Sequence, residues 1–234
     1  MRIVSWNLLR RVGASADDVA RLIESEQPDL MLMQEATREI DSLADRIGGH
    51  YARSPLPGRL HGVACWSPRP FRTEPQILPL QPGAMIRRVC QLIDCGPFWV
   101  ANVHLSHGQV LNRRQLRLIA ENLPERCAVL GDFNLVGPAL LPGFRDVGPR
   151  GPTHRMIEVV GVRLDRCLAR GLACQLAEIL PPRRSDHHPI KVELRPLDAA
   201  TPRRPAQAAH LAAHAVPSAP SHRPTGLRRP QPYR

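Results

Sequence analysis

The chain has 234 residues, of which 43% are hydrophobic, and a formal net charge of +11 at pH 7. This length suits one large domain or two small ones, with enough apolar side chains for a sizeable core. No apolar run approaches the roughly 20 residues of a membrane-spanning helix. The N-terminal stretch MRIVSWNLLRR lacks the apolar segment and cleavage site of a secretory signal. We therefore expect a cytoplasmic protein without a transmembrane segment.

Arginine carries almost all of the positive charge, since Lys191 is the only lysine. Such a bias suits a GC-rich genome as well as a phosphate-binding role. A basic field of this size nevertheless favours anionic partners such as nucleic acid or anionic lipid. The six cysteines form no CxxC pair and no zinc-ligand spacing, and most lie in apolar runs, where a reduced cysteine behaves as a small hydrophobic residue.

Strand-like and helix-like segments alternate through residues 1–195. Hydrophobic runs predict strands at 2–7, 28–36, 62–66, 85–95, 98–105, 127–134, 162–169, 174–179 and 188–194. Helical spacing predicts helices over 15–26, with Ser15 as N-cap, over 37–49 and over 112–123. The pair 85–95 and 98–105 looks antiparallel across Gly96–Pro97, which favours an α+β fold or a mixed sheet over a pure βαβ fold.

Residues 196–234 have a different composition, rich in Pro, Ala, Arg and His and poor in β-branched and aromatic residues. They carry six arginines against Asp198, a net charge of +5 out of the total of +11, which leaves +6 on residues 1–195. Such a segment cannot bury enough apolar surface to offset the entropy of ordering it. We therefore predict a catalytic domain over 1–195 and a disordered basic tail over 196–234 that is dispensable for chemistry.

The hydrophobic run Cys127–Leu130 ends in the residues GDFN, and this ending has two interpretations. Gly131 with Asp132 could form an ordinary turn, because Asp and Asn often close strands. Other predicted strands also end in, or begin beside, a carboxylate, a carboxamide or an imidazole. The full set is Asn7, Glu35, His104, Asp132, Asn134, Asp165, Asp186 and His187. Because sites are usually built at strand ends along one rim of a sheet, we expect these side chains to lie together.

Four of these side chains are carboxylates: Glu35, Asp132, Asp165 and Asp186. Like charges about 4 Å apart repel by about 4 kcal/mol at an effective dielectric constant of 20. Either some of the four are protonated or a divalent cation neutralises them. Oxygen ligands without thiolates indicate Mg²⁺ or Mn²⁺ rather than zinc. A cation held by few protein ligands keeps open positions for a phosphate oxygen, so this set predicts phosphoryl chemistry.

The ordered segments IVSWN, LMLMQEA, VANVHLS, GDFN, RLD and SDHHP resemble the successive motifs of the endonuclease/exonuclease/phosphatase superfamily. That superfamily includes deoxyribonuclease I, abasic-site endonucleases, neutral sphingomyelinases and inositol-polyphosphate phosphatases. The resemblance spans residue 3 to about residue 194. It implies an α/β (α+β), deoxyribonuclease I-like fold: a four-layer sandwich of two packed mixed β-sheets flanked by helices. It also implies an enzyme that hydrolyses a phosphoester with a metal-organised water and Mg²⁺ or Mn²⁺, and it favours the catalytic interpretation of GDFN.

The resemblance implies a role for each residue around the metal. Glu35 would be the main metal ligand, with Asn7 beside it and Asp186 also at the metal. Asp132 would bind and activate the attacking water or help to hold a second metal. Asn134 would donate a hydrogen bond to a phosphate oxygen.

The resemblance also assigns the imidazoles. His187 would contact the phosphate, oriented by Asp165 through its other ring nitrogen, and it fits the motif S-D-H-x-P better than its rival His188. His104 would be the acid for the leaving oxygen. Leu9 stands where abasic-site endonucleases commonly have an acid, and His104 where they commonly have Tyr. Both departures point away from abasic-site repair.

The substrate stays open at this level. The positive charge favours a nuclease-like phosphodiesterase, while lipid or small-molecule phosphoester hydrolysis and a catalytically silent phosphate-binding module remain alternatives. Arg113 and Arg114, on the helix after His104, could reach phosphate, although a solvated basic helix face explains them better. Oligomeric state is undetermined, and we assume a monomer.

Overall fold

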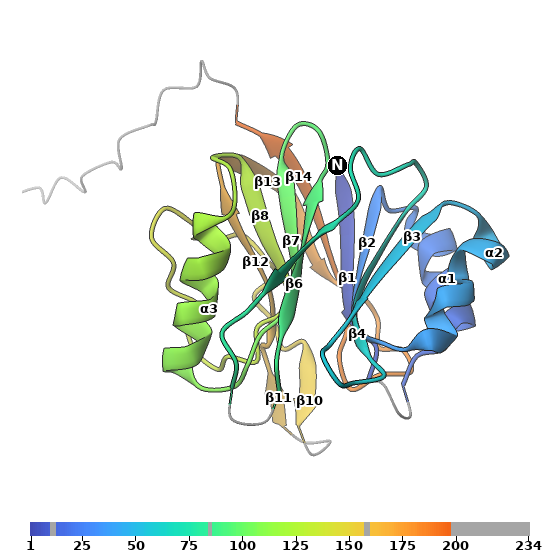
Figure 1. Ribbon diagram of the computed structural model, residues 1–234, viewed down its shortest axis with the longest axis horizontal. Helices are drawn as coiled ribbons and strands as arrows, with labels where there is room; N and C mark the ends of the chain where they lie inside the picture. Colours follow the sequence, from blue (N-terminus) through green and yellow to red (C-terminus); the bar gives the residue numbers. More distant parts are fainter. Residues whose placement is uncertain (10–12, 84–85, 157–159, 198–234) are drawn as a thin grey trace, which may run out of the picture. The chain divides into compact units, whose positions relative to one another are not determined.

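The computed structural model describes residues 1–9, 13–83, 86–156 and 160–197. They belong to one compact unit built from two six-stranded mixed sheets that pack face to face (Figure 1). Helices cover the outer face of each sheet, so the predicted four-layer sandwich is confirmed. The predicted tail, except for Pro196 and Leu197, lies outside the described residues. Within the described part, no helix is long and apolar enough to cross a membrane.

The first sheet has the strand order β13–β14–β1–β2–β4–β3. Its strands, in chain order, are β1 (Arg2–Asn7), β2 (Leu30–Ala36), β3 (His50–Pro55), β4 (Gly62–Ser67), β13 (Leu172–Ile179) and β14 (Ile190–Pro196). Strands β1 and β2 run parallel, as the crossover helix α1 (Ala16–Glu26) between them requires, and the other neighbours run antiparallel. Helix α1 begins at the predicted cap, because Ser15 and Asp18 form a capping box.

The helix predicted over 37–49 is only partly correct. A 3₁₀ helix, η1 (Arg38–Ser42), comes first, and the short α2 (Leu43–Ile47) follows it. Ile40 and Leu43 are both buried and lie three residues apart, so the tighter 3₁₀ turn keeps them on one face. The spacing of apolar residues therefore predicts a helical segment here correctly, but it does not distinguish a 3₁₀ helix from an α-helix.

The second sheet has the strand order β5–β6–β7–β8–β12–β9. Its strands are β5 (Gln76–Pro79), β6 (Val89–Asp94), β7 (Trp99–His104), β8 (Cys127–Asp132), β9 (Arg145–Asp146) and β12 (Asp165–Arg170). The predicted antiparallel pair across Gly96–Pro97 is confirmed as β6 and β7. Strands β7 and β8 run parallel, and the helix between them, α3 (Gln109–Glu121), begins three residues before the predicted start at 112. The hairpin β10 (His154–Met156) with β11 (Val160–Val162) completes the fold.

The pattern of hydrophobic residues failed to predict β3, β5, β9 and the β10–β11 hairpin. Strands β3 and β5 lie at sheet edges and are largely half-buried or exposed, so they lack the continuous apolar runs that marked the central strands. Strand β9 has only two residues. Short or edge strands of this kind are stabilised by their neighbours in the sheet rather than by their own composition.

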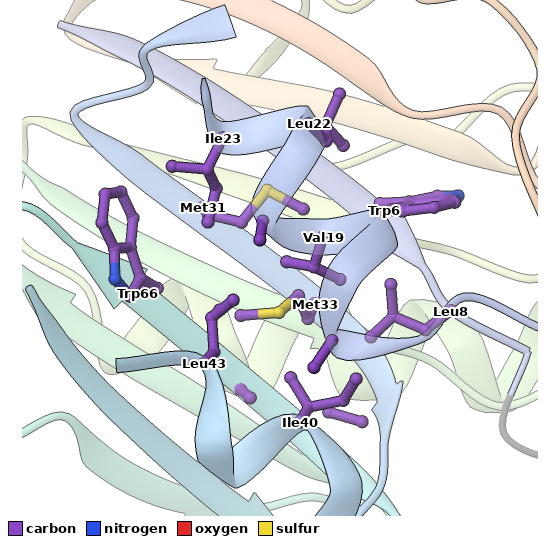
Figure 2. Close-up of a cluster of buried hydrophobic side chains, with 14 of the residues drawn as sticks. Trp6, Leu8, Val19, Leu22, Ile23, Met31, Met33, Ile40, Leu43 and Trp66 are labelled. Atoms are coloured by element: carbon purple, nitrogen blue, oxygen red, sulfur yellow. The ribbon is translucent and has the colours of Figure 1, made fainter. Parts of the chain in front are cut away.

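Three apolar clusters hold the layers together. In the first, α1 and α2 pack on the outer face of the first sheet, where Trp6, Met31, Met33 and Trp66 meet Leu22 and Ile23 (Figure 2). In the second, α3 packs on the outer face of the second sheet. The third fills the space between the sheets and includes Ile3, Leu32, Val100, Ala128, Leu130 and Cys167. This division fixes which alternate side chains of each strand point between the sheets.

Candidate active site

Strand parity directs the predicted polar residues towards the space between the sheets. Successive side chains alternate faces, and Ile3, Val100 and Leu130 belong to the inter-sheet cluster. Two steps further along β8, and four along β1 and β7, stand Asp132, Asn7 and His104. The carboxyl ends of the parallel strands therefore bring these three residues to one edge of the sandwich, where β12 begins and the segment before β14 arrives.

Asp132 is the centre of this group and is 1% exposed. Its Oδ2 accepts hydrogen bonds from Asn7 Nδ2 at 3.0 Å and Asn134 Nδ2 at 3.2 Å, and its Oδ1 accepts one from the Asn134 backbone N–H at 2.8 Å. His104 Nε2 lies 3.3 Å from the same Oδ2. Burial raises the pKa of Asp132, and the nearby Asp165 adds to this effect, while His187 and the hydrogen bonds oppose it. The carboxylate is held in one orientation by neighbours from three strand ends.

Gly131 is part of strand β8, so the structure has no turn at Gly131–Asp132. Its φ is +138°, and a Cβ there would lie 2.1 Å from the Val103 carbonyl oxygen on β7. No side chain fits between the two parallel strands at this point. The glycine of GDFN therefore permits the close approach that sets His104 opposite Asp132 in the register.

His187 and Asp165 form a buried pair. His187 Nδ1 donates to Asp165 Oδ2 at 2.8 Å, and the other ring nitrogen, Nε2, lies 3.8 Å from Asp132 Oδ2. Burial opposes the charged imidazolium, but Asp165, Asp132 and Asp186 outweigh it and raise the pKa of His187 to about 9. Trp6 Nε1 donates to the His187 carbonyl at 2.9 Å and so fixes the backbone. His187 is thus held as a cation at neutral pH.

His104 has the opposite protonation. It is 4% exposed, and burial, together with Arg88 and neighbouring histidines, lowers its pKa well below 6.5. At pH 7 its ring is neutral, so one nitrogen carries a proton and the other does not. The neutral ring can donate to Asp132 without adding a buried charge.

Glu35 and Asp186 lie at the same edge. Glu35 follows Gln34, whose carbonyl accepts from the Leu8 N–H at 2.9 Å, so it stands beside Asn7 at the end of β1. Its φ is +56°, at an irregularity in the pairing of β2 with β4. Such strain in a residue other than glycine is concentrated at functional sites.

Ser185 ties the Asp186 segment to β1. The Ser185 hydroxyl donates to the Asn7 carbonyl at 2.7 Å and accepts from the His187 N–H at 3.1 Å. Asp186 itself accepts from His154 Nε2 at 3.2 Å. The segment before β14 is therefore anchored at three points beside the strand ends.

The donor set suits a hard divalent cation. Glu35, Asp132 and Asp186 would offer carboxylate oxygens and Asn7 an amide oxygen, the ligands that Mg²⁺ and Mn²⁺ prefer. Among the described residues, the side chains within ion-pair distance of Asp132, Asp165 and Asp186 are all histidines, and none is an arginine or lysine. The single imidazolium of His187 faces two buried carboxylates, Asp132 and Asp165, so negative charge remains that a cation would neutralise.

Two predicted residues are not brought to this group by any described contact. Arg113 is half-buried and Arg114 exposed on α3, and among the described residues no hydrogen bond or ion pair links either to the site. The residue of α3 that contacts the site edge is instead Asn112, whose side-chain amide donates to the carbonyls of Ser106 and Phe133. Phosphate binding by the two arginines therefore stays a prediction.

Sequence reasoning missed a network of buried amides beneath the site. Gln34 Nε2 donates to Asn102 Oδ1 at 2.8 Å, and Asn102 Nδ2 donates to Gln91 Oε1 at 3.0 Å. All three side chains are fully buried, and the network joins β2 of one sheet to β7 and β6 of the other. The only signal in the sequence was the presence of amides inside apolar runs. The network fixes the distance between the sheets directly below Glu35 and His104.

Sequence reasoning also left out two residues beside the SDHH segment. Thr153 Oγ1 accepts from the backbone N–H groups of Leu164 and Asp165, and so positions the start of β12. His154 contacts Asp186 and His187. Thr153 precedes strand β10 and His154 begins it, and this strand is too short to predict, so no pattern in the sequence indicated them.

The two-sheet sandwich with carboxylates, carboxamides and histidines at one edge defines the class of protein. A family model described as the Endonuclease/Exonuclease/phosphatase family matches residues 4–187. The chain belongs to this family of phosphoester hydrolases, whose members typically depend on a divalent metal. A comparison with curated protein sequences gives no significant match.

Several solved structures share the fold. An endonuclease/exonuclease/phosphatase from Beutenbergia cavernae is 19% identical with a TM-score of 0.66, covering 84% of this chain and 71% of its own. Truncated TDP2 from Caenorhabditis elegans is 18% identical, with a TM-score of 0.61 and coverage of 82% and 95%. A mannosyl-6-phosphatase from Bacteroides thetaiotaomicron is 17% identical, with a TM-score of 0.62 and coverage of 83% and 99%. At these identities the likeness concerns the fold.

Proposed function

We propose that this chain is a divalent-metal-dependent phosphoester hydrolase that acts as a nuclease-like phosphodiesterase. The observation that carries the proposal is the buried Asp132 carboxylate, which Asn7, Asn134 and His104 hold beside the charged His187–Asp165 pair. Asp132 Oδ2, which can accept a proton from water, thus lies 3.8 Å from Nε2 of the His187 imidazolium, which can bind a phosphate oxygen.

The residues divide into a metal-binding side and a water-binding side. Glu35, Asn7 and Asp186 would hold the cation, which when bound polarises the phosphate and lowers the pKa of a water. Asp132 orients the attacking water and takes its proton, because its two oxygens face different donors and its raised pKa makes it a better base than an exposed carboxylate. Asn134 Nδ2 donates to the Leu105 carbonyl at 3.0 Å and to Asp132 Oδ2 at 3.2 Å, and in this proposal it exchanges the longer of these two bonds for one to a phosphate oxygen.

In this proposal His187 binds the phosphate through its Nε2–H. Its Nδ1–H is held by Asp165, so Nε2–H is the donor available for a non-bridging oxygen. The imidazolium stabilises negative charge as it develops in the transition state and then serves as the proton source for the leaving oxygen.

For His104 we propose a different role from the acid that the family resemblance implied. A ring with a pKa well below 6.5 holds no extra proton to deliver at neutral pH. Its contact with Asp132 at 3.3 Å suits a neutral donor that orients the carboxylate. His104 is therefore a positioning residue in this proposal.

A specific observation favours small phosphoesters as the second candidate substrate class. A pocket of about 450 Å³ begins two residues after Glu35 and is lined by Arg38, Arg59 and His61 among others. Its cationic side chains suit a compact anionic substituent beside the scissile phosphate. The net charge of +11 still favours a long polyanion such as nucleic acid over this alternative.

The test is a parallel assay with Mg²⁺ or Mn²⁺ on plasmid DNA, RNA, abasic duplex, phospholipid vesicles and inositol phosphates. Asp132→Asn is the blank, and the Glu35→Gln and His187→Gln variants should each lose most activity without additive effects, since the three serve one transition state. Full metal-dependent activity of Asp132→Asn on every substrate would contradict the mechanism. Turnover of lipid alone would replace the nuclease assignment and keep the mechanism.

The tail can be tested separately. Because β14 extends to Pro196 and the Leu197 N–H donates to the Gly171 carbonyl, truncation after Leu197 keeps the last strand intact. We expect unchanged activity on a small chromogenic phosphodiester and weaker DNA binding, most visibly at low salt. Equal DNA affinity of the truncated and full chains would show that the tail contributes nothing to binding.

A further inference from the structure

His154 lies against the SDHH segment because β10 is held there by backbone contacts. His154 and His187 form an isolated antiparallel bridge. On its two sides, the Arg155 N–H donates to the Asp186 carbonyl at 2.9 Å and the His188 N–H donates to the Thr153 carbonyl at 2.7 Å. These backbone contacts fix the main chain of His154 beside the SDHH segment, and so they bring its imidazole to Asp186 and His187.

Three potential metal ligands meet at this point. His154, Asp186 and His187 each offer one ligand atom, and these atoms lie within 4.8 Å of one another. His154 Nε2 is 3.2 Å from Asp186 Oδ2, and the two imidazole rings meet edge to face, with centroids 4.5 Å apart. Within the described residues, His154 Nδ1 is buried and has no hydrogen-bond partner.

An ordinary hydrogen bond between His154 and Asp186 explains only part of this arrangement. It accounts for one contact, but not for the second imidazole beside it. The pair His187–Asp165 matters here as well, because a carboxylate on Nδ1 is the usual partner of a metal-binding histidine. Asp165 keeps the proton on Nδ1, so a metal ion that binds His187 displaces the Nε2 proton of the imidazolium and takes that nitrogen.

The chemistry of the cluster differs from that of the carboxylate centre. Two imidazole nitrogens and one carboxylate form a three-ligand set that suits Zn²⁺ or Co²⁺, with a fourth position left for water. Mg²⁺ strongly prefers oxygen ligands and gains little from imidazole. A late transition metal between His154 and Asp186 would take the place of the proton in their hydrogen bond.

We propose that His154, Asp186 and His187 form a binding site for Zn²⁺ or a similar late transition metal, and that its occupation blocks hydrolysis. The second half of this proposal rests on the proposed function, in which Asp186 holds the divalent cation and His187 contacts the phosphate. A Zn²⁺ ion on these two side chains withdraws both from the substrate. The chain thereby binds one class of metal for activity and another for inhibition.

The binding half is tested without substrate. The full chain, prepared without a polyhistidine tag and stripped with chelator, is titrated with Zn²⁺ by calorimetry and with Co²⁺ by visible absorption. We expect one tight equivalent and a ligand-field spectrum, and His154→Gln should lower the ratio of Zn²⁺ to Mg²⁺ affinity at least about tenfold. His50→Gln is the matched control, because His50 is an exposed histidine at the first position of β3. The opposite end of this strand, where Pro55 pairs with Gly62, is the end that lies near the site edge.

The outcomes separate this proposal from the proposed function. Equal Zn²⁺ affinity in the wild type and in His154→Gln, or Zn²⁺ binding no tighter than Mg²⁺ binding, overturns the site. If a phosphoester is hydrolysed, low Zn²⁺ should inhibit the wild type and His50→Gln but spare the residual rate of His154→Gln. Inhibition that is identical in all three overturns the blocking role. A chain that hydrolyses nothing but shows the expected Zn²⁺ titrations would refute only the proposed function.

Discussion

Asp165→Asn removes one charge from the fully buried partner of His187 with almost no change in shape. The rise of the His187 pKa from 6.5 to about 9 corresponds to about 3 kcal/mol of preference for the imidazolium, because each tenfold change is worth about 1.4 kcal/mol. Asp165 is the foremost of the carboxylates that cause this rise, whereas burial opposes it. Without the Asp165 charge, we expect the pKa of His187 to fall below about 9, because burial then opposes the imidazolium with only Asp132 and Asp186 left to favour it.

The direction of the pH effect follows from the sign of the shift. A raised pKa in the folded state stabilises the fold fully below the unfolded value of 6.5, and this contribution is lost as pH rises through about 9. Activity that needs the imidazolium should likewise fall through about pH 9 in the wild type. In Asp165→Asn that alkaline limit should move to lower pH.

Two measurements check this expectation. One is the pH dependence of phosphodiester hydrolysis, and the other is an NMR titration of the His187 ring, which needs no substrate. Asp94→Asn is the matched control, since Asp94 lies at the far end of β6 and pairs with Arg72. An alkaline limit and a His187 titration unchanged in Asp165→Asn would refute the reasoning that Asp165 maintains the charge.

Three further substitutions test the fold. Gly131→Ala should lower the free energy of unfolding by about 3 kcal/mol or more in urea titrations, because its Cβ would meet the Val103 carbonyl at a strained φ. Asp146→Asn should cost about 3 kcal/mol, since it leaves the mostly buried Arg163 without its two-point partner. Burial alone would raise the Asp146 pKa but Arg163 lowers it, so this loss should vanish as pH falls below about 3.8. Ser15→Ala should cost about 1 kcal/mol in thermal unfolding by removing the α1 cap; no change in melting would contradict the capping box.

The sequence by itself determined the central strands, two of the three main helices and the residues at the strand ends. These features are local: an apolar run, a helical spacing or a cap acts between residues a few positions apart. Asn7 and His104 were recognisable because each closes a continuous apolar strand.

Tertiary structure decided the rest, because the remaining contacts join residues far apart in the chain. Asn7 and Asp132 are separated by 125 positions and meet only through the order of strands in two packed sheets. The same packing buries His104 and charges His187, so two histidines at one site acquire opposite protonation. His154 lies at the site because it forms an isolated β-bridge with His187. A single bridge of this kind produces no periodic pattern in the sequence.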